Sequence, residues 1–141
     1  MTDSHDETPY DELDPAIVNL CMTINAMPGI WTSGSYGGHP KGEGLLPEDE
    51  WLVIFGCEVD DDERPTRDAW LSLEFAAWAI HDIGRGATVG LGVSSPPPWM
   101  NEPARSIYFA LEGRRGADGI EPDAVAELLT TWAAPFLEDD R

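Results

Sequence analysis

The chain has 141 residues and a formal net charge of −19, because 27 Asp and Glu residues outnumber 8 Lys and Arg residues. Hydrophobic residues make up 42% of it, which excludes a disordered acidic chain and is enough for one domain with its own core. The charge disfavours direct binding to DNA or RNA, because phosphates require a basic protein surface.

Both ends of the chain are polar and acidic, and we expect them to be tails outside the folded domain. The N-terminal tail covers 1–12, the single domain 13–137 and the C-terminal tail 138–141. The first residues lack the basic start and apolar middle of a signal peptide, and no apolar run is long enough to cross a membrane. We therefore expect a cytoplasmic protein without membrane contact.

The first predicted helix leads into the most specialised part of the sequence. Asp14 and Pro15 are a typical helix start, and Pro28-Gly29 is a typical helix end. A short strand is expected over 30–33, followed by a loop over 34–46 that is rich in glycine. A second strand is expected over 51–59, and its apolar residues on both faces indicate a central position in a sheet.

The second predicted helix covers 66–83 and is apolar around most of its circumference. A narrow strip of small or polar residues interrupts this surface, at Asp68, Ser72, Ala76 and Ala79. The pattern predicts a helix wrapped by protein, or one with a spare apolar face for a partner. The acid-rich segment that precedes the helix, 58–63, lacks the glycine of a calcium loop and is expected to be a solvated turn.

Two more strands and a third helix complete the expected fold. The strands are expected over 88–94 and 105–113, and the helix begins at Pro122 and is limited by Pro135. The order is α-β-β-α-β-β-α, with neighbouring strands joined by short links. We therefore expect one α+β domain, with a four-stranded, largely antiparallel sheet packed with three helices. The alternative is a mixed sheet in which the long helix connects parallel strands.

The densest set of groups suited to ligand binding lies between 32 and 39 and offers hydroxyls, a phenol, an imidazole and glycine-freed backbone amides. Such groups suit an anion or a sugar-phosphate. Two residues on one line of the second helix are expected to complete the site. The predicted ligand-binding residues are Thr32, Ser33, Ser35, Tyr36, Gly37, Gly38, His39, Glu74 and His81. The alternative is a structural connection in which Tyr36 and His39 cover the sheet edge.

Other chemistries find little support in the sequence. The segment 32–39 lacks the Gly-Lys-Ser/Thr end of a phosphate loop and the helix start of a dinucleotide fingerprint. His5, His39 and His81 are widely spaced and there is no Cys-x-x-Cys, so we expect neither a metal site nor a cofactor. No nucleophile elbow is present, and we expect no catalytic residues. Cys21 and Cys57 are expected to be free thiols in the core.

Residues 24–32, with the sequence INAMPGIWT, and 35–39, with the sequence SYGGH, carry a resemblance to a known family. They resemble the signature Asn-x-x-Pro-Gly-x-x-Thr, then Ser-Cys-x-Gly-Arg or His, of the wybutosine-synthesising Tyw3-like proteins and of small bacterial and phage proteins. The Tyw3 family implies methyl transfer from S-adenosylmethionine to a modified guanosine of tRNA. Here Tyr36 replaces the cysteine, and His39 stands where Tyw3 has arginine. The resemblance implies a helix, a strand and a loop at a pocket mouth.

From these patterns we expect a non-catalytic protein that binds a small anionic or nucleotide-like ligand, or a protein partner. One alternative is an acidic interaction protein, of the kind that phages encode, which blocks a basic partner. Another is a degenerate relative of the Tyw3-like methyltransferases. The acidic surface also fits solubility or adaptation to a salty cytoplasm.

Overall fold

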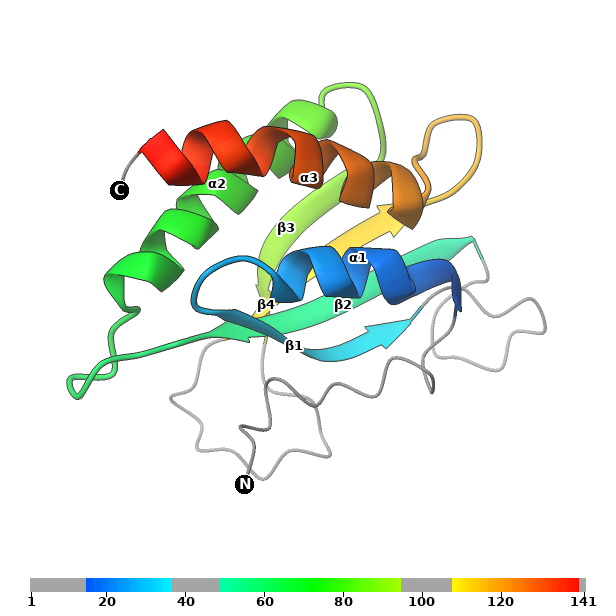
Figure 1. Cartoon of the computed structure of the whole chain (residues 1–141). Coiled ribbons are helices and arrows are strands. Elements are labelled where there is room, and N and C mark those ends of the chain that lie inside the picture. Colours follow the sequence, from blue (N-terminus) through cyan, green and yellow to red (C-terminus); the bar gives the residue numbers. More distant parts are fainter. Residues whose placement is uncertain (1–14, 37–48, 95–107, 140–141) are drawn as a thin grey trace.

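In the computed structural model, the described residues are 15–36, 49–94 and 108–139, and they form one α+β arrangement. The predicted order and fold class are confirmed (Figure 1). The elements in chain order are α1 (Pro15–Asn25), β1 (Ile30–Tyr36), β2 (Glu50–Cys57), α2 (Arg67–Ile83), β3 (Val89–Ser94), β4 (Tyr108–Arg114) and α3 (Pro122–Asp139).

The four described strands form a single sheet in the order β1-β2-β4-β3. All three pairings are antiparallel, so the alternative of a mixed sheet is wrong. The three helices lie together over one face of the sheet (Figure 1). α1 packs against β1 and α3, whereas α2 packs against β3 and α3, which places β1 and α2 toward opposite edges.

β1 is longer than the sequence predicts. Its pairing with β2 shifts register between Thr32 and Gly34, so Ser33 is the extra residue of a β-bulge. After the bulge the strand continues, and Tyr36 pairs with Leu52. The predicted loop from residue 34 onward is therefore wrong for residues 34–36, which belong to the strand. Gly34 marks a β-bulge within the strand, not the end of the strand.

α3 also exceeds its predicted end. It continues through Pro135 to Asp139, so the first two residues of the expected tail at 138–141 belong to the helix. Proline removes the backbone hydrogen bond to the carbonyl four residues earlier. The helix nevertheless continues past Pro135, so this proline does not mark its end. The rest of the C-terminal tail and the whole N-terminal tail lie outside the described residues.

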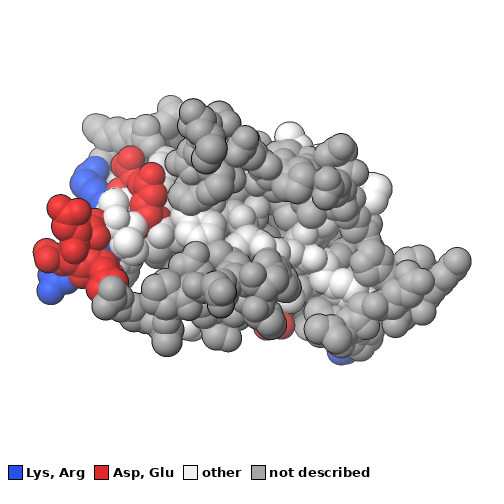
Figure 2. All heavy atoms as spheres, turned by 90° about the horizontal axis from the view of Figure 1, so that it is seen from below, with Lys and Arg blue, Asp and Glu red and all other residues white. Residues whose placement is uncertain are grey.

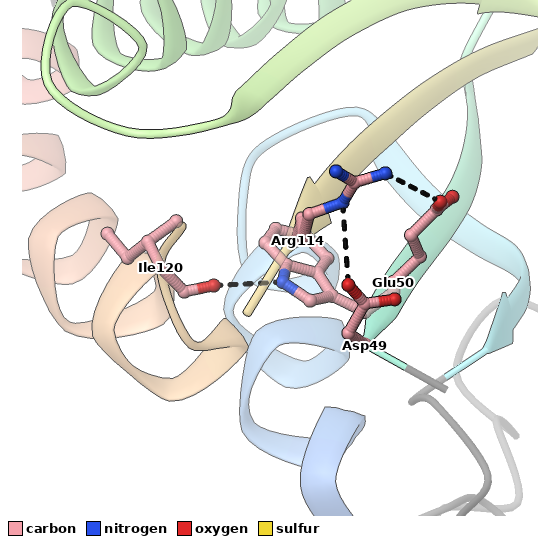
Figure 3. Close-up of polar contacts among 5 residues, drawn as sticks. Asp49, Glu50, Arg114 and Ile120 are labelled. Carbon is pink, nitrogen blue, oxygen red and sulfur yellow. Dashed lines mark hydrogen bonds and ion pairs between the residues drawn. The ribbon is translucent and has the colours of Figure 1, made fainter. Parts of the chain in front are cut away.

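The core lies between the helices and the sheet and is built on large aromatic and aliphatic side chains. Trp51, Phe55 and Phe75 are buried in it, together with Ile17, Leu20 and Ile24 of α1 and Leu129 of α3. The Trp51 indole also needs a hydrogen-bond acceptor. Its Nε1 donates to the carbonyl oxygen of Ile120 at 3.0 Å, next to an ion pair between Arg114 and Glu50 (Figure 3).

The buried face of α2 combines three residues of the predicted small or polar strip with Phe75, Ile80 and Ile83, whereas Asp68 of that strip is exposed. Ser72, Ala76 and Ala79 are buried, whereas Trp70 and Trp78 are 55% and 50% exposed. The small side chains let α2 lie close to its neighbours: the Ser72 hydroxyl donates to the Pro28 carbonyl at 2.6 Å. The helix ends at Ile83 before Gly84 as predicted, and it begins one residue later than predicted, at Arg67, with Thr66 as its N-cap. The ring of Trp78 packs against the ring of Trp132 on α3, with 5.4 Å between the ring centroids.

The acidic segment between β2 and α2 is a solvent-exposed turn. Asp60, Asp61, Asp62 and Glu63 are all exposed, and Asp60 caps the turn by accepting from the backbone amides of Asp62 and Arg64. On the face drawn in Figure 2, the described acidic side chains gather at the end of the molecule where this turn lies. The turn concentrates negative charge at this end.

Candidate functional site

Thr32 of the predicted site lies on the face of β1 that packs against α1. Its backbone amide donates to Oδ1 of Asn25 at 2.7 Å, and Nδ2 of Asn25 donates back to its hydroxyl at 3.1 Å. Asn25 is the last residue of α1, so this pair of bonds fixes the end of the helix to the following strand. Both side chains are thus engaged in holding two elements together.

Ser35 also faces α1, where it meets Cys21. Burial raises the pKa of the Cys21 thiol, and a hydrogen bond with the Ser35 hydroxyl offsets part of this effect. The pKa of the Cys57 thiol is raised as well, by burial and then by the charge of Glu58. Cys21 is buried as predicted, whereas Cys57 is only half-buried, and both are free. A raised pKa favours the protonated thiol, which is a poor nucleophile.

The remaining predicted residues on β1 lie at the bulge and at the strand end. The Ser33 hydroxyl approaches the Ile54 carbonyl at 3.5 Å, and Tyr36 is half-buried at the last paired position. Gly37, Gly38 and His39 lie outside the described residues. Tyr36 is therefore the last described residue of the predicted segment.

Glu74 and His81 of α2 are not brought together with the β1 residues. Glu74 is exposed and lies about 200° around the helix from Ser72, which faces the Pro28 turn, so it is directed away from that turn. His81 lines a hollow of about 400 Å³ between α2 and β3. Because β3 and β1 are opposite edges of the sheet, three strand spacings of about 4.8 Å each separate them.

The change Thr32→Val tests whether this residue serves the fold. Valine keeps the shape but removes the oxygen that accepts from Asn25, so we expect a loss of about 1 kcal/mol in the free energy of unfolding, measured in urea. Thr131→Val is the control, because its hydroxyl bonds only the Glu127 carbonyl within an exposed helix turn. Equal stability of the two variants would contradict a structural role for Thr32.

A groove lies between α1 and α3, and no pattern in the sequence predicts it. Its volume is about 850 Å³. Apolar side chains form most of it, namely Met22, Ala26, Met27, Phe75, Ala126, Leu129 and Ala133. Polar side chains complete it, namely Asn19, Thr23, Asp123, Glu127, Thr130 and Thr131. No single segment carries a motif for this site, because it exists only where two distant helices meet.

The polar atoms of the groove are mostly hydrogen-bond acceptors. The hydroxyls of Thr23, Thr130 and Thr131 donate to carbonyls four residues earlier in their own helices, at 2.8, 2.8 and 2.9 Å. The Asn19 amide donates to Oδ1 of Asp123 at 3.2 Å, which joins the two helices at one end. Carboxylate oxygens and threonine lone pairs are left to face a ligand. Among the described lining residues there is no lysine or arginine.

The described residues contain neither a cluster that could hold a metal ion nor a helix that could cross a membrane. Among the described residues, no three or more His, Cys, Asp or Glu side chains are grouped so that they could hold a metal ion. Within the same part of the chain, no helix is long and apolar enough to cross a membrane. The groove offers apolar contact and acceptors, which are the means of holding a ligand.

No protein-family model, curated protein or solved structure matches the chain. The resemblance of residues 24–39 to the Tyw3-like signature therefore stays a prediction from the sequence. The function of this protein has to be inferred from the geometry of its described residues.

Proposed function

We propose that this protein is a non-catalytic binding protein and that the groove between α1 and α3 is its binding site. The observation that carries the proposal is the groove itself, with a volume of about 850 Å³ and a lining of apolar side chains edged by carboxylates and threonines. Ligand sites are typically hollows of this size that are mostly apolar and hold a few directed polar groups.

The floor of the groove is formed by residues of the hydrophobic core, which supports a preformed site. Phe75, Met27, Ala126 and Leu129 all belong to the hydrophobic core and are nearly inaccessible. Met22 lies at the edge of the groove and is 48% exposed. A methionine is flexible and polarisable and adapts to ligands of different shape. The groove thus combines a buried floor with an edge, at Met22, that can adapt to the shape of a ligand.

The polar lining defines the class of ligand. Asp123 and Glu127 would repel the anionic or nucleotide-like ligand that the segment 32–39 suggested. A ligand with an apolar body and with donors or a positive charge fits the acceptors. The site favoured by the structure therefore differs from the predicted one in its place and in its charge.

Methionine methyl signals in NMR spectra test this proposal, because two of the four methionines, Met22 and Met27, line the groove. We expect amphipathic amines from a fragment library to shift these two signals. Ala26→Phe should fill part of the groove and weaken binding about tenfold. Ala77→Phe is the control, because Ala77 is likewise an exposed alanine, and it lies on α2 outside the groove. Fragments that bind without moving Met22 or Met27, or equally well to both variants, would contradict the proposal.

A further inference from the structure

We propose that the occupant of the groove is a basic amphipathic helix of a partner protein. This inference rests on the proposed function, because it identifies the ligand of the same site. Three properties of the described residues lead to it: the elements that form the walls, the charges that line them and the chemistry of the exposed apolar side chains.

Both walls of the groove are α-helices, which limits the form of a peptide ligand. The backbone groups along a helix are already paired, so an extended peptide finds no strand edge to join here. A helical ligand needs only side-chain contacts, made by apolar residues that recur every three or four positions. α1 has 11 residues and is therefore about 16 Å long, which corresponds to three turns of such a ligand.

The groove carries negative charge at a spacing that suits a basic helix. Asp123 and Glu127 are four residues apart on α3 and so lie on the same side of it, one turn from each other. The Asn19 amide orients Asp123, and both carboxylates are exposed to solvent. Lysine or arginine residues spaced by one turn on the ligand would face both carboxylates. The net charge of −19 would attract such a helix from a distance as well.

The apolar part of the groove suits a ridge of aliphatic side chains. Met22 offers flexible exposed surface at the edge, Met27 and Leu129 form the nearly inaccessible floor, and the alanines at 26, 126 and 133 leave space between the helices. Surfaces rich in methionine are used to bind amphipathic helices of varied sequence. The groove is open to solvent, as a site for a macromolecular ligand requires.

Three synthetic peptides of about 15 residues provide the probes. The first has leucines on one helical face and lysines on the other, the second has glutamates in place of the lysines, and the third has the composition of the first in scrambled order. Affinity is measured by fluorescence anisotropy with the full chain at physiological salt. We expect the first peptide to bind at least about tenfold more tightly than either of the others.

Two double variants separate the groove from the overall charge. Asp123→Asn with Glu127→Gln should weaken binding of the lysine peptide about tenfold, whereas Asp61→Asn with Asp118→Asn should leave it unchanged. Both pairs remove two negative charges, but Asp61 and Asp118 lie in exposed turns outside the groove. Should Asp123→Asn disturb the first turn of α3, Glu127→Gln alone gives the same comparison with Asp61→Asn alone.

The apolar contact has its own matched pair. Met22→Ala should weaken binding of the lysine peptide, and Val93→Ala, which truncates another exposed aliphatic residue on β3, should not.

Each contrary result would overturn the inference in a distinct way. Equal weakening by both double variants would indicate attraction by net charge alone, and equal binding of the scrambled peptide would exclude recognition of a helix. Equal binding of the glutamate peptide would exclude the charge argument. Amine fragments that shift Met22 and Met27 while no peptide binds would overturn this inference and leave the proposed function standing. If no fragment shifts these signals and no peptide binds, both proposals fail.

Discussion

Replacing Trp51 by alanine should lower the free energy of unfolding by about 3–5 kcal/mol. Trp51 has no exposed surface, and its indole Nε1 donates to the Ile120 carbonyl just before α3. The change leaves a cavity between the sheet and the helices and removes the donor to a partly buried carbonyl. Urea unfolding followed by circular dichroism measures the loss.

Two tryptophan variants provide the controls for this result. Trp51→Phe keeps an aromatic ring but loses the hydrogen bond, so we expect a smaller loss than for alanine. Trp70→Ala removes the same side chain from an exposed position on α2 and should cost much less. Similar losses for Trp51→Ala and Trp70→Ala would show that the core is not organised around Trp51.

Gly29→Ala should be the second severe change, with a loss of about 3 kcal/mol. Gly29 has a φ of +73°, and a Cβ placed there would lie 2.8 Å from the backbone nitrogen of Ala69 and 2.9 Å from its Cα. The nearest atoms belong to the backbone of α2, which cannot rotate away as a side chain would. Alanine would therefore strain the Pro28-Gly29 turn and force α2 away from it. Thermal and urea unfolding report the effect.

Variants at two other glycines distinguish the effect of backbone strain from that of steric collision. Gly116 has a φ of +111° but no described atom near its virtual Cβ, so Gly116→Ala should show the cost of strain without collision. Gly90 has neither feature, and Gly90→Ala should be nearly neutral. A loss for Gly29→Ala no larger than that for Gly116→Ala would contradict close packing of α2 on the Pro28-Gly29 turn.

The sequence was a good guide to those elements whose signals are local. Pro15, the Thr66 cap and Gly84 mark helix ends, and the alternation of Trp51, Val53 and Phe55 marks a buried strand. Each of these signals depends on neighbouring residues alone. The fold class could be predicted from the order of elements because short links between strands favour antiparallel pairing.

The features that the sequence did not predict arise from contacts between distant segments. The Ser33 bulge is defined by pairing with β2, and the buried face of α2 by how closely its small residues approach the Pro28 turn. The apolar pattern of α2 does not show that Ala76 and Ala79 are buried with Phe75 while Trp70 and Trp78 stay half exposed. The groove requires that α1 and α3 be neighbours, and neither helix carries a motif for it.

The predicted site shows how one residue type serves two purposes. Hydroxyls near a glycine suit a ligand, but the hydroxyls of Thr32 and Ser35 bond Asn25 and Cys21 of α1. Whether a hydroxyl faces a ligand or a neighbouring helix depends on strand orientation, and the bulge at Ser33 alters that orientation midway along β1. Spacing alone could not distinguish the two.

The bulge also bears on how copies of this protein avoid aggregating. β1 and β3 are the two edges of the described sheet, and an edge strand is a template on which another chain can add a strand. The β-bulge at Ser33 makes β1 a poor template for such pairing. β3 contains glycine at 90 and 92 and no charged residue, so its own sequence offers no such protection. At β3, repulsion between copies that each carry −19 would oppose edge-to-edge pairing, so we expect the colloidal stability of the protein to fall as ionic strength rises.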